Sequence, residues 1–151
     1  MTTQTAESVT LELKRLIKAP RERVFEAWTT PNEIMKWFGP KDGCEVLGAD
    51  VDLRVDGEYR IRANSERCGG AVEVGGVYRE IKRPSRLVYT WGWNDPRLDV
   101  GETVVTVDFV DLNGATEVRL RHEGLPNAEA RESHNYGWTG SLEKLEALFS
   151  K

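Results

Sequence analysis

The sequence predicts an α+β domain built on an antiparallel sheet of about six or seven strands. Apolar and polar residues alternate through most of the middle of the chain, which is typical of half-buried strands. Two short helical stretches follow the first strand, and one long helical stretch closes the chain. Helices that are segregated in this way from a run of hairpin-linked strands favour an α+β fold over alternating βα units.

Size and composition narrow the class further. A chain of 151 residues with 39% hydrophobic and 30% charged residues is typical of one globular domain, and we expect a disordered tail at 1–7 and a single domain over 8–151. The net charge of −4 argues against a sequence-independent nucleic-acid binder and gives no attraction to anionic membranes. With no apolar run of about 18 residues and no signal peptide, we expect a cytoplasmic protein with no integral membrane association, whose Cys44 and Cys68 are reduced thiols.

The first elements are a strand and two short helices. Alternation from Val9 predicts a half-buried strand that ends at Ala19-Pro20. Proline suits the first position of a helix, because its missing N–H needs no partner there, so we expect Pro20 and Pro31 each to begin a helix. Gly39-Pro40 should end the second one.

Strands and turns follow, and then the closing helix. The predicted strands are CEVLGADVDL, EYRIRA after a turn at Asp56-Gly57, AVEVGGVYREI, RLVYTWGW, ETVVTVDFVDL and ATEVRLRHE. The apolar parity flips across Gly75-Gly76, which predicts a bulge there. NDPRLDVG is predicted to be a loop, and Asn113-Gly114 is a strong hairpin signal. The closing helix should run from about 127 to 150.

Sequence motifs give little support for cofactor or metal chemistry. The chain has no phosphate-binding glycine loop, no dinucleotide-binding fingerprint, no Gly-x-Ser-x-Gly elbow and no His-Glu-x-x-His. The charged residues of the strands alternate with apolar ones, which predicts a solvated sheet face. We therefore predict no cofactor, no catalytic constellation and no metal site.

Both histidines are predicted to point inward. His122 shares strand parity with Leu120, and His134 lies four residues before Trp138 on the closing helix. Three interpretations stay open: histidines hydrogen-bonded at the rim of the core, polar anchors inside a ligand cavity, or metal ligands for which no third ligand is visible.

Tryptophan is the other prominent signal, with five residues in the chain. By strand and helix face, Trp28, Trp91, Trp93 and Trp138 point toward the same interior. They either pack as ordinary core residues or line a pocket that their rings do not close.

The closing helix carries two glycines beside its apolar face, Gly137 and Gly140, each of which should cost about 1 kcal/mol relative to alanine. We expect them to allow a close approach of another segment or to leave space beside Trp138. Gly137→Leu is therefore expected to overpack the domain or to fill its pocket.

Five stretches together resemble a known family. IKAPRERVFEAWTTP, MKWFGP, GGVYREIKRPSRLVYTWGW, TVVTVDFVDLNGATEVRLRHEGLP and HNYGWTGSLEKLEAL occur in the order and at the spacing found in the activator of Hsp90 ATPase homologue family, part of the START-like (SRPBCC, Bet v 1-like) superfamily. The resemblance runs from about Val9 to Leu148. It implies a helix-grip fold, in which a curved antiparallel sheet wraps a long C-terminal helix, two short helices close the opposite end, and a deep apolar cavity commonly lies between sheet and helix.

The resemblance implies binding of lipids, sterols, polyketides or other apolar small molecules. Our first functional hypothesis is therefore a module that binds a small apolar or amphipathic molecule. The residues expected to line its cavity are Trp28, Tyr59, Trp91, Trp93, Val107, Phe109, Leu120, His122, His134, Trp138 and Leu142.

Two further hypotheses belong to other classes. A cyclase or hydrolase would need His122 or His134 as a general base, although no activated nucleophile or oxyanion device is visible. A protein-interaction module would need an exposed apolar patch, for which NEIMKWFGP is the best candidate; the same stretch could instead be a lid or a dimer contact. We expect a monomer or homodimer. A chaperone partnership does not carry over directly, because the chaperone-engaging domain of the eukaryotic protein has no counterpart in this sequence.

Overall fold

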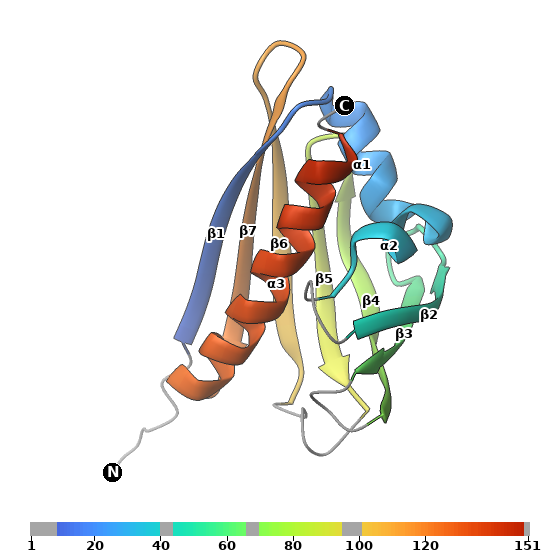
Figure 1. The fold of residues 1–151 in the computed structure, drawn as a ribbon, viewed down its shortest axis with the longest axis vertical. Coiled ribbons are helices and arrows are strands. Elements are labelled where there is room, and N and C mark those ends of the chain that lie inside the picture. Colours follow the sequence, from blue (N-terminus) through green and yellow to red (C-terminus); the bar gives the residue numbers. More distant parts are fainter. Residues whose placement is uncertain (1–8, 40–43, 66–69, 95–100, 150–151) are drawn as a thin grey trace.

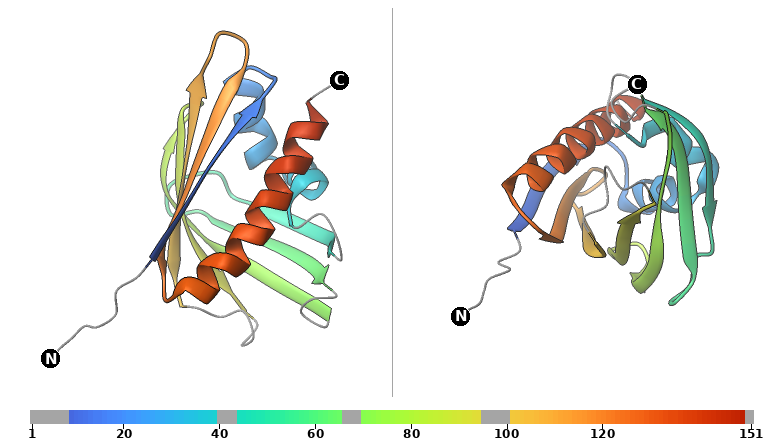
Figure 2. Two further views of the ribbon diagram at one scale, coloured as in Figure 1. Left: turned by 60° about the vertical axis from the view of Figure 1, so that its left-hand side comes forward. Right: turned by 90° about the horizontal axis from the view of Figure 1, so that it is seen from below.

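A curved seven-stranded antiparallel sheet wraps around one long helix (Figures 1 and 2). The structure is a computed structural model that describes residues 9–39, 44–65, 70–94 and 101–149. The strands are β1 (Val9–Ile17), β2 (Cys44–Val51), β3 (Glu58–Ser65), β4 (Gly70–Lys82), β5 (Arg86–Trp93), β6 (Thr103–Asp111) and β7 (Thr116–Leu125), and the helices are α1 (Arg21–Thr29), α2 (Pro31–Trp37) and α3 (Ala128–Leu148). The strand order is β1-β7-β6-β5-β4-β3-β2, so the predicted α+β helix-grip fold is confirmed. The predicted tail at 1–7 and most of the predicted loop at 94–101 lie outside the described residues, as does Cys68.

The two short helices begin where proline fixes the backbone, although not in the same way. Pro31 is the first residue of α2, as predicted. Pro20 remains extended and caps α1 from outside, so the prediction that it begins the helix is wrong by one residue. Its carbonyl oxygen accepts hydrogen bonds from the N–H groups of Arg23 and Val24, which is the role of an N-cap residue.

The predicted bulge at Gly75-Gly76 is wrong, because the register of β4 runs unbroken past both glycines. The irregularity lies instead between Tyr78 and Glu80, opposite β5. Gly76 takes an inward position of the same parity as Tyr78. A Cβ on Gly76 would overlap the backbone carbonyl of Thr90 on β5, so glycine is needed here for the close approach of two strands.

The β6–β7 hairpin confirms the Asn113-Gly114 prediction. Both residues have positive φ angles, 61° and 98°, as a type I′ turn requires. By contrast, β2 ends at Val51 and the connection to β3 spans residues 52–57, which is longer than the turn predicted at Asp56-Gly57.

The long helix α3 begins at a capped end and runs across the concave side of the sheet (Figure 2). The side chain of Asn127 accepts a hydrogen bond from the N–H of Ala130 at 2.8 Å. Within the described residues, no helix is long and apolar enough to cross a membrane.

Hydrogen bonds from α3 hold the end of α2. Ser141 Oγ accepts from the N–H of Gly39 at 2.8 Å, and Lys144 Nζ donates to the carbonyl of Phe38 at 2.9 Å. These bonds place the residues that directly follow α2 against the C-terminal half of α3, over the interior of the sheet (Figure 1).

Of the two roles expected for Gly137, the structure fits open space rather than the close approach of another segment. A Cβ on Gly137 would meet no atom within 4 Å, so this position faces open space rather than a neighbouring segment. A Cβ at this position therefore meets no neighbouring segment, and whether the longer side chain of Gly137→Leu overpacks the domain or fills its pocket stays a prediction. The helix pattern located Trp138 correctly on the buried face, where it is only 4% exposed, but it could not show what surrounds the residue before it.

Candidate functional site

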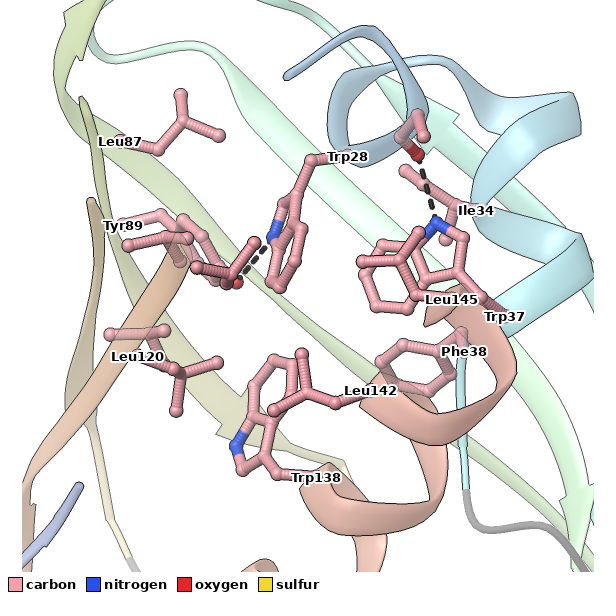
Figure 3. Packing of buried hydrophobic residues seen from close by; sticks show 14 of the residues in the cluster. Trp28, Ile34, Trp37, Phe38, Leu87, Tyr89, Leu120, Trp138, Leu142 and Leu145 are labelled. Atoms are coloured by element: carbon pink, nitrogen blue, oxygen red, sulfur yellow. Dashed lines mark hydrogen bonds between the residues drawn. The ribbon is translucent and has the colours of Figure 1, made fainter. Parts of the chain in front are cut away.

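The interior between the sheet and α3 is built mainly from aromatic rings. Trp28 comes from α1, Trp37 from α2 and Trp138 from α3, and Figure 3 shows Trp28 between the other two rings and Tyr89 of β5. Their separations are short, with ring centroids of Trp28 and Trp37 4.5 Å apart and those of Trp28 and Trp138 6.2 Å apart. The inward parity of the strands and the helical spacing of α1 and α3 bring these rings together.

A cavity of about 20 Å³ remains where the rings meet. This volume is about enough for one water molecule. Eight of its ten lining residues are aromatic, and none carries a charge. The lining residues are Trp28, Ile34, Trp37, Phe38, Tyr59, Ile61, Tyr78, Tyr89, Trp91 and Trp138.

Most polar atoms of the cavity lining are paired. The indole N–H of Trp28 donates to the hydroxyl of Tyr89 at 3.1 Å, and that of Trp37 donates to the carbonyl of Ala27 at 2.9 Å (Figure 3). The hydroxyl of Tyr59 donates to the carbonyl of Thr90 at 2.6 Å. Burial raises the pKa of Tyr59, Tyr78 and Tyr89, so all three hydroxyls stay protonated near neutral pH.

The two histidines lie together at the other end of the interior, with ring centroids 5.0 Å apart. We call His122, His134, Trp93, Trp138 and Thr103 the histidine network. Trp138 donates its indole N–H to His122 Nδ1 at 3.2 Å, which places the His122 proton on Nε2, and Nε2–H then donates to Thr103 Oγ1 at 2.7 Å. The Thr103 hydroxyl donates in turn to the carbonyl of Trp91 at 3.2 Å.

His134 is held in the same manner by two partners. Trp93 donates its indole N–H to His134 Nε2 at 3.2 Å, so the proton of the ring lies on Nδ1, which donates to the carbonyl of Ala130 at 2.8 Å. Every ring nitrogen of the two histidines therefore has a partner. Among the interpretations left open by the sequence, the geometry fits hydrogen-bonded histidines in the core.

Both histidines are kept neutral by their surroundings. Burial, and to a smaller extent the neighbouring His134, lower the pKa of His122 to about 3. Burial also lowers the pKa of His134, against a smaller opposing effect of its hydrogen bond to Ala130. A neutral histidine with both nitrogens bonded is poorly placed to act as a general base.

Within the described part of the chain, one fully buried polar atom of the cavity lining has no partner. The indole N–H of Trp91 is buried, and it finds no hydrogen-bond acceptor in the described part of the chain. Trp91 also lines the cavity, beside Trp138 at a centroid distance of 5.0 Å and Phe38 at 6.0 Å.

The structure brings together some of the residues predicted from the sequence and separates others. Four of them line the cavity, namely Trp28, Tyr59, Trp91 and Trp138. The rest lie elsewhere in the core or in the histidine network: Val107, Phe109, Leu120 and Leu142 are buried, His122 and His134 are buried and paired, and Trp93 is half-buried.

Sequence reasoning missed several lining residues. Tyr89 shares inward strand parity with Trp91, so the same signal could have found it. Tyr78 was missed because the predicted parity flip at Gly75-Gly76 turned it to the outer face. The described part of NEIMKWFGP does not form the exposed patch that an interaction module would need, because Ile34, Trp37 and Phe38 are buried against the cavity and only Met35 of the four apolar side chains is exposed. The alternatives of a lid or a dimer contact stay predictions.

Other kinds of site find no support in the described ranges. No group of three or more histidine, cysteine or acidic residues is placed to hold a metal ion there. Charged residues of the strands lie on the outer face in ion pairs, such as Arg62 with Asp50 at 3.0 Å and Arg119 with Glu117 at 2.8 Å. Mixed charges of this kind give no basic surface for nucleic acid.

Comparison with known proteins agrees with this architecture. The family described as Activator of Hsp90 ATPase homolog 1-like protein matches residues 18–150. The chain belongs to this family. No curated protein matches it in sequence.

Solved structures of relatives share the whole fold of this family member. A protein from Chromobacterium violaceum is 34% identical with a TM-score of 0.81, over 94% of this chain and 97% of that one. A protein from Silicibacter pomeroyi, named for the same family, is 27% identical with a TM-score of 0.79, over 93% and 96%. A protein from Rhizobium leguminosarum is 25% identical with a TM-score of 0.80, over 98% of both chains. START-like folds commonly bind small ligands, so the interior of this family member is its candidate functional site.

Proposed function

We propose that this protein binds a small apolar or amphipathic molecule in the cavity between the sheet and α3, in the cytoplasm. The observation that carries the proposal is that ten apolar and aromatic side chains meet around a space that they do not fill. Protein interiors normally leave few voids as large as a water molecule, and ligand sites are typically apolar hollows with a few polar groups.

Binding of a ring-sized molecule requires the cavity to widen, since about 20 Å³ holds only one water. The α2 side is the part of the lining that can move most easily. Ile34 and Trp37 come from this seven-residue helix and Phe38 directly follows it, and the end of the helix is held by hydrogen bonds to α3 rather than by strand pairing. Widening costs free energy, so only a fraction of the protein molecules would have the open cavity. The apparent affinity for the ligand would be lower than the affinity of the open form by that fraction.

A panel of apolar and amphipathic compounds tests the proposal through tryptophan emission and thermal unfolding. A ligand at 100 times its Kd stabilises the folded state by about 2.7 kcal/mol, which corresponds to roughly 5–10 °C in Tm for a domain of this size. A panel in which no compound changes either the emission or the Tm would contradict the proposal.

Matched variants locate the binding. Ile61→Phe adds volume to a lining residue of β3, whereas Val110→Phe adds the same ring to a half-buried position of β6 that is not part of the lining. Ligand-induced shifts should shrink in Ile61→Phe and persist in Val110→Phe. Equal loss in both variants would place the binding outside the cavity.

No observation favours the other two hypotheses, a cyclase or hydrolase and a protein-interaction module. The histidines that an enzyme would use are neutral and fully bonded, and the apolar side chains of α2 that an interaction patch would use are mostly buried.

A further inference from the structure

The five tryptophans of the chain differ in how their indole N–H groups are paired. Four of these groups donate hydrogen bonds: Trp28 to Tyr89, Trp37 to Ala27, Trp93 to His134 and Trp138 to His122. The fifth, on Trp91, is buried and has no acceptor in the part of the chain that is described. Buried indole N–H groups usually find a partner, so the exception calls for a physical explanation.

The neighbours of Trp91 have no free ring nitrogen to offer as an acceptor. Its ring lies 5.5 Å from that of His122 and 6.3 Å from that of His134, measured between centroids. His122 Nδ1 already accepts from Trp138, and His134 Nε2 already accepts from Trp93. A neutral imidazole has only one acceptor nitrogen, so neither ring can also pair with Trp91.

The lining around Trp91 is unfavourable for charge. None of the ten lining residues is ionised near neutral pH, since the three tyrosines stay protonated. A carboxylate placed there would lose its hydration without gaining a cationic partner. An uncharged acceptor atom, such as a carbonyl or ether oxygen, loses far less hydration and would complete the hydrogen bonding of the Trp91 N–H.

We infer that the Trp91 indole N–H is the polar anchor of the cavity, and that the ligand is an uncharged, ring-sized molecule with a hydrogen-bond acceptor. This inference rests on the proposed function and adds the chemical class of ligand to it. The surrounding rings of Phe38, Trp138 and Tyr89 supply the apolar contacts, while Trp91 selects the acceptor.

Three small probes of similar shape separate the parts of this inference: acetophenone, which carries a carbonyl; ethylbenzene, which lacks it; and benzoate, which is charged. The wild-type protein should bind acetophenone about five- to tenfold more tightly than ethylbenzene, as one hydrogen bond allows, and benzoate most weakly. In an NMR spectrum of the indole N–H groups, acetophenone should shift one resonance downfield, and Trp91→Phe should remove that resonance.

Two variants provide the decisive comparison. Trp91→Phe keeps an aromatic ring in the lining without its N–H, so the preference for acetophenone over ethylbenzene should disappear. Val110→Phe keeps every indole N–H and changes a half-buried position of β6 outside the lining, so the preference should remain.

The outcomes separate this inference from the proposed function. Equal binding of acetophenone and ethylbenzene to the wild-type protein overturns the role of Trp91 and leaves ligand binding in the cavity intact. A preference for acetophenone that persists in Trp91→Phe also overturns the role of Trp91, because another group must then donate the hydrogen bond to the ligand. Absence of binding by both neutral probes overturns the proposed function, and this inference with it.

Discussion

The histidine network and the cavity are neighbouring parts of one interior, and they differ in whether their buried polar atoms have hydrogen-bond partners. Trp138 belongs to both, and Trp91 lies between them. In the network, each ring nitrogen of His122 and His134 has a partner. In the cavity, space remains and the Trp91 N–H is unpaired.

This difference shows that inward-pointing polar groups do not by themselves mark a binding site. In a network whose hydrogen-bonding groups are all paired, the residues stabilise one arrangement of the core. Leaving any of these buried groups unpaired lowers the stability of the folded protein. A buried group that the fold leaves unpaired is available to a ligand. The available donor here belongs to a tryptophan rather than to either histidine.

Removal of His122 should give the largest effect. His122→Ala empties a fully buried position and leaves the Trp138 N–H without its acceptor, so we expect a loss of about 3 kcal/mol or more in the free energy of unfolding. Arg121→Ala is the control on the outer face of the same strand, where exposed ion pairs are worth less than about 1 kcal/mol. Chemical denaturation measures both, and similar small losses would show that the network is not structural.

Acidification should weaken the network before it affects the cavity. A histidine whose pKa is lower in the folded protein contributes stability that is full above its unfolded value of about 6.5 and is lost as the pH falls toward the folded value. With a folded pKa of about 3 for His122, its share of this loss should be about 2 kcal/mol at pH 5, and His134 acts in the same direction. Denaturation at pH 7 and pH 5 measures the loss, and His122 ring resonances that titrate near pH 6.5 in the folded protein would contradict it.

Two tryptophans allow a direct comparison between the regions, because Trp91 and Trp138 are each 4% exposed. Trp138→Phe leaves His122 Nδ1 without its donor, whereas Trp91→Phe removes an N–H that is already unpaired. Both lose similar volume, so Trp138→Phe should cost roughly 1–2 kcal/mol more in unfolding free energy. Equal costs would mean that the Trp91 N–H has a partner in solution.

The sequence was sufficient to predict the fold because the fold depends on local patterns. Alternation located the strands, proline and glycine located most helix and turn boundaries, and Asn113-Gly114 identified the final hairpin. The exceptions depend on contacts across the sheet. Gly76 suggested a bulge, but it is a glycine because β5 approaches closely, which only the pairing of β4 with β5 reveals.

The candidate site could be predicted only in part, for the same reason. Strand parity and helical spacing correctly predicted that Trp28, Trp91, Trp138 and both histidines point inward. Which indole N–H finds an acceptor depends on distances and angles between side chains of different elements, and parity contains no such information. The sequence left open whether the α2 stretch is a lid or an exposed patch, because a short helix that carries Ile34 and Trp37 and is followed by Phe38 can lie against the core or face solvent with equal local propensity.

The smallest effect is expected for Gly137, and it tests whether the open space beside this residue is part of the cavity that Trp138 lines. A Cβ on Gly137 meets nothing, so Gly137→Ala should gain helix propensity and raise the free energy of unfolding by about 0.5–1 kcal/mol without changing ligand binding. Gly76→Ala is the contrasting variant, since its Cβ would overlap the Thr90 carbonyl and should cost about 1–3 kcal/mol. Thermal unfolding with and without acetophenone measures both. If Gly137→Ala weakened acetophenone binding while the protein kept its stability, the open space beside Gly137 would be part of the ligand site. The expectation that this position does not contribute to binding would then be wrong.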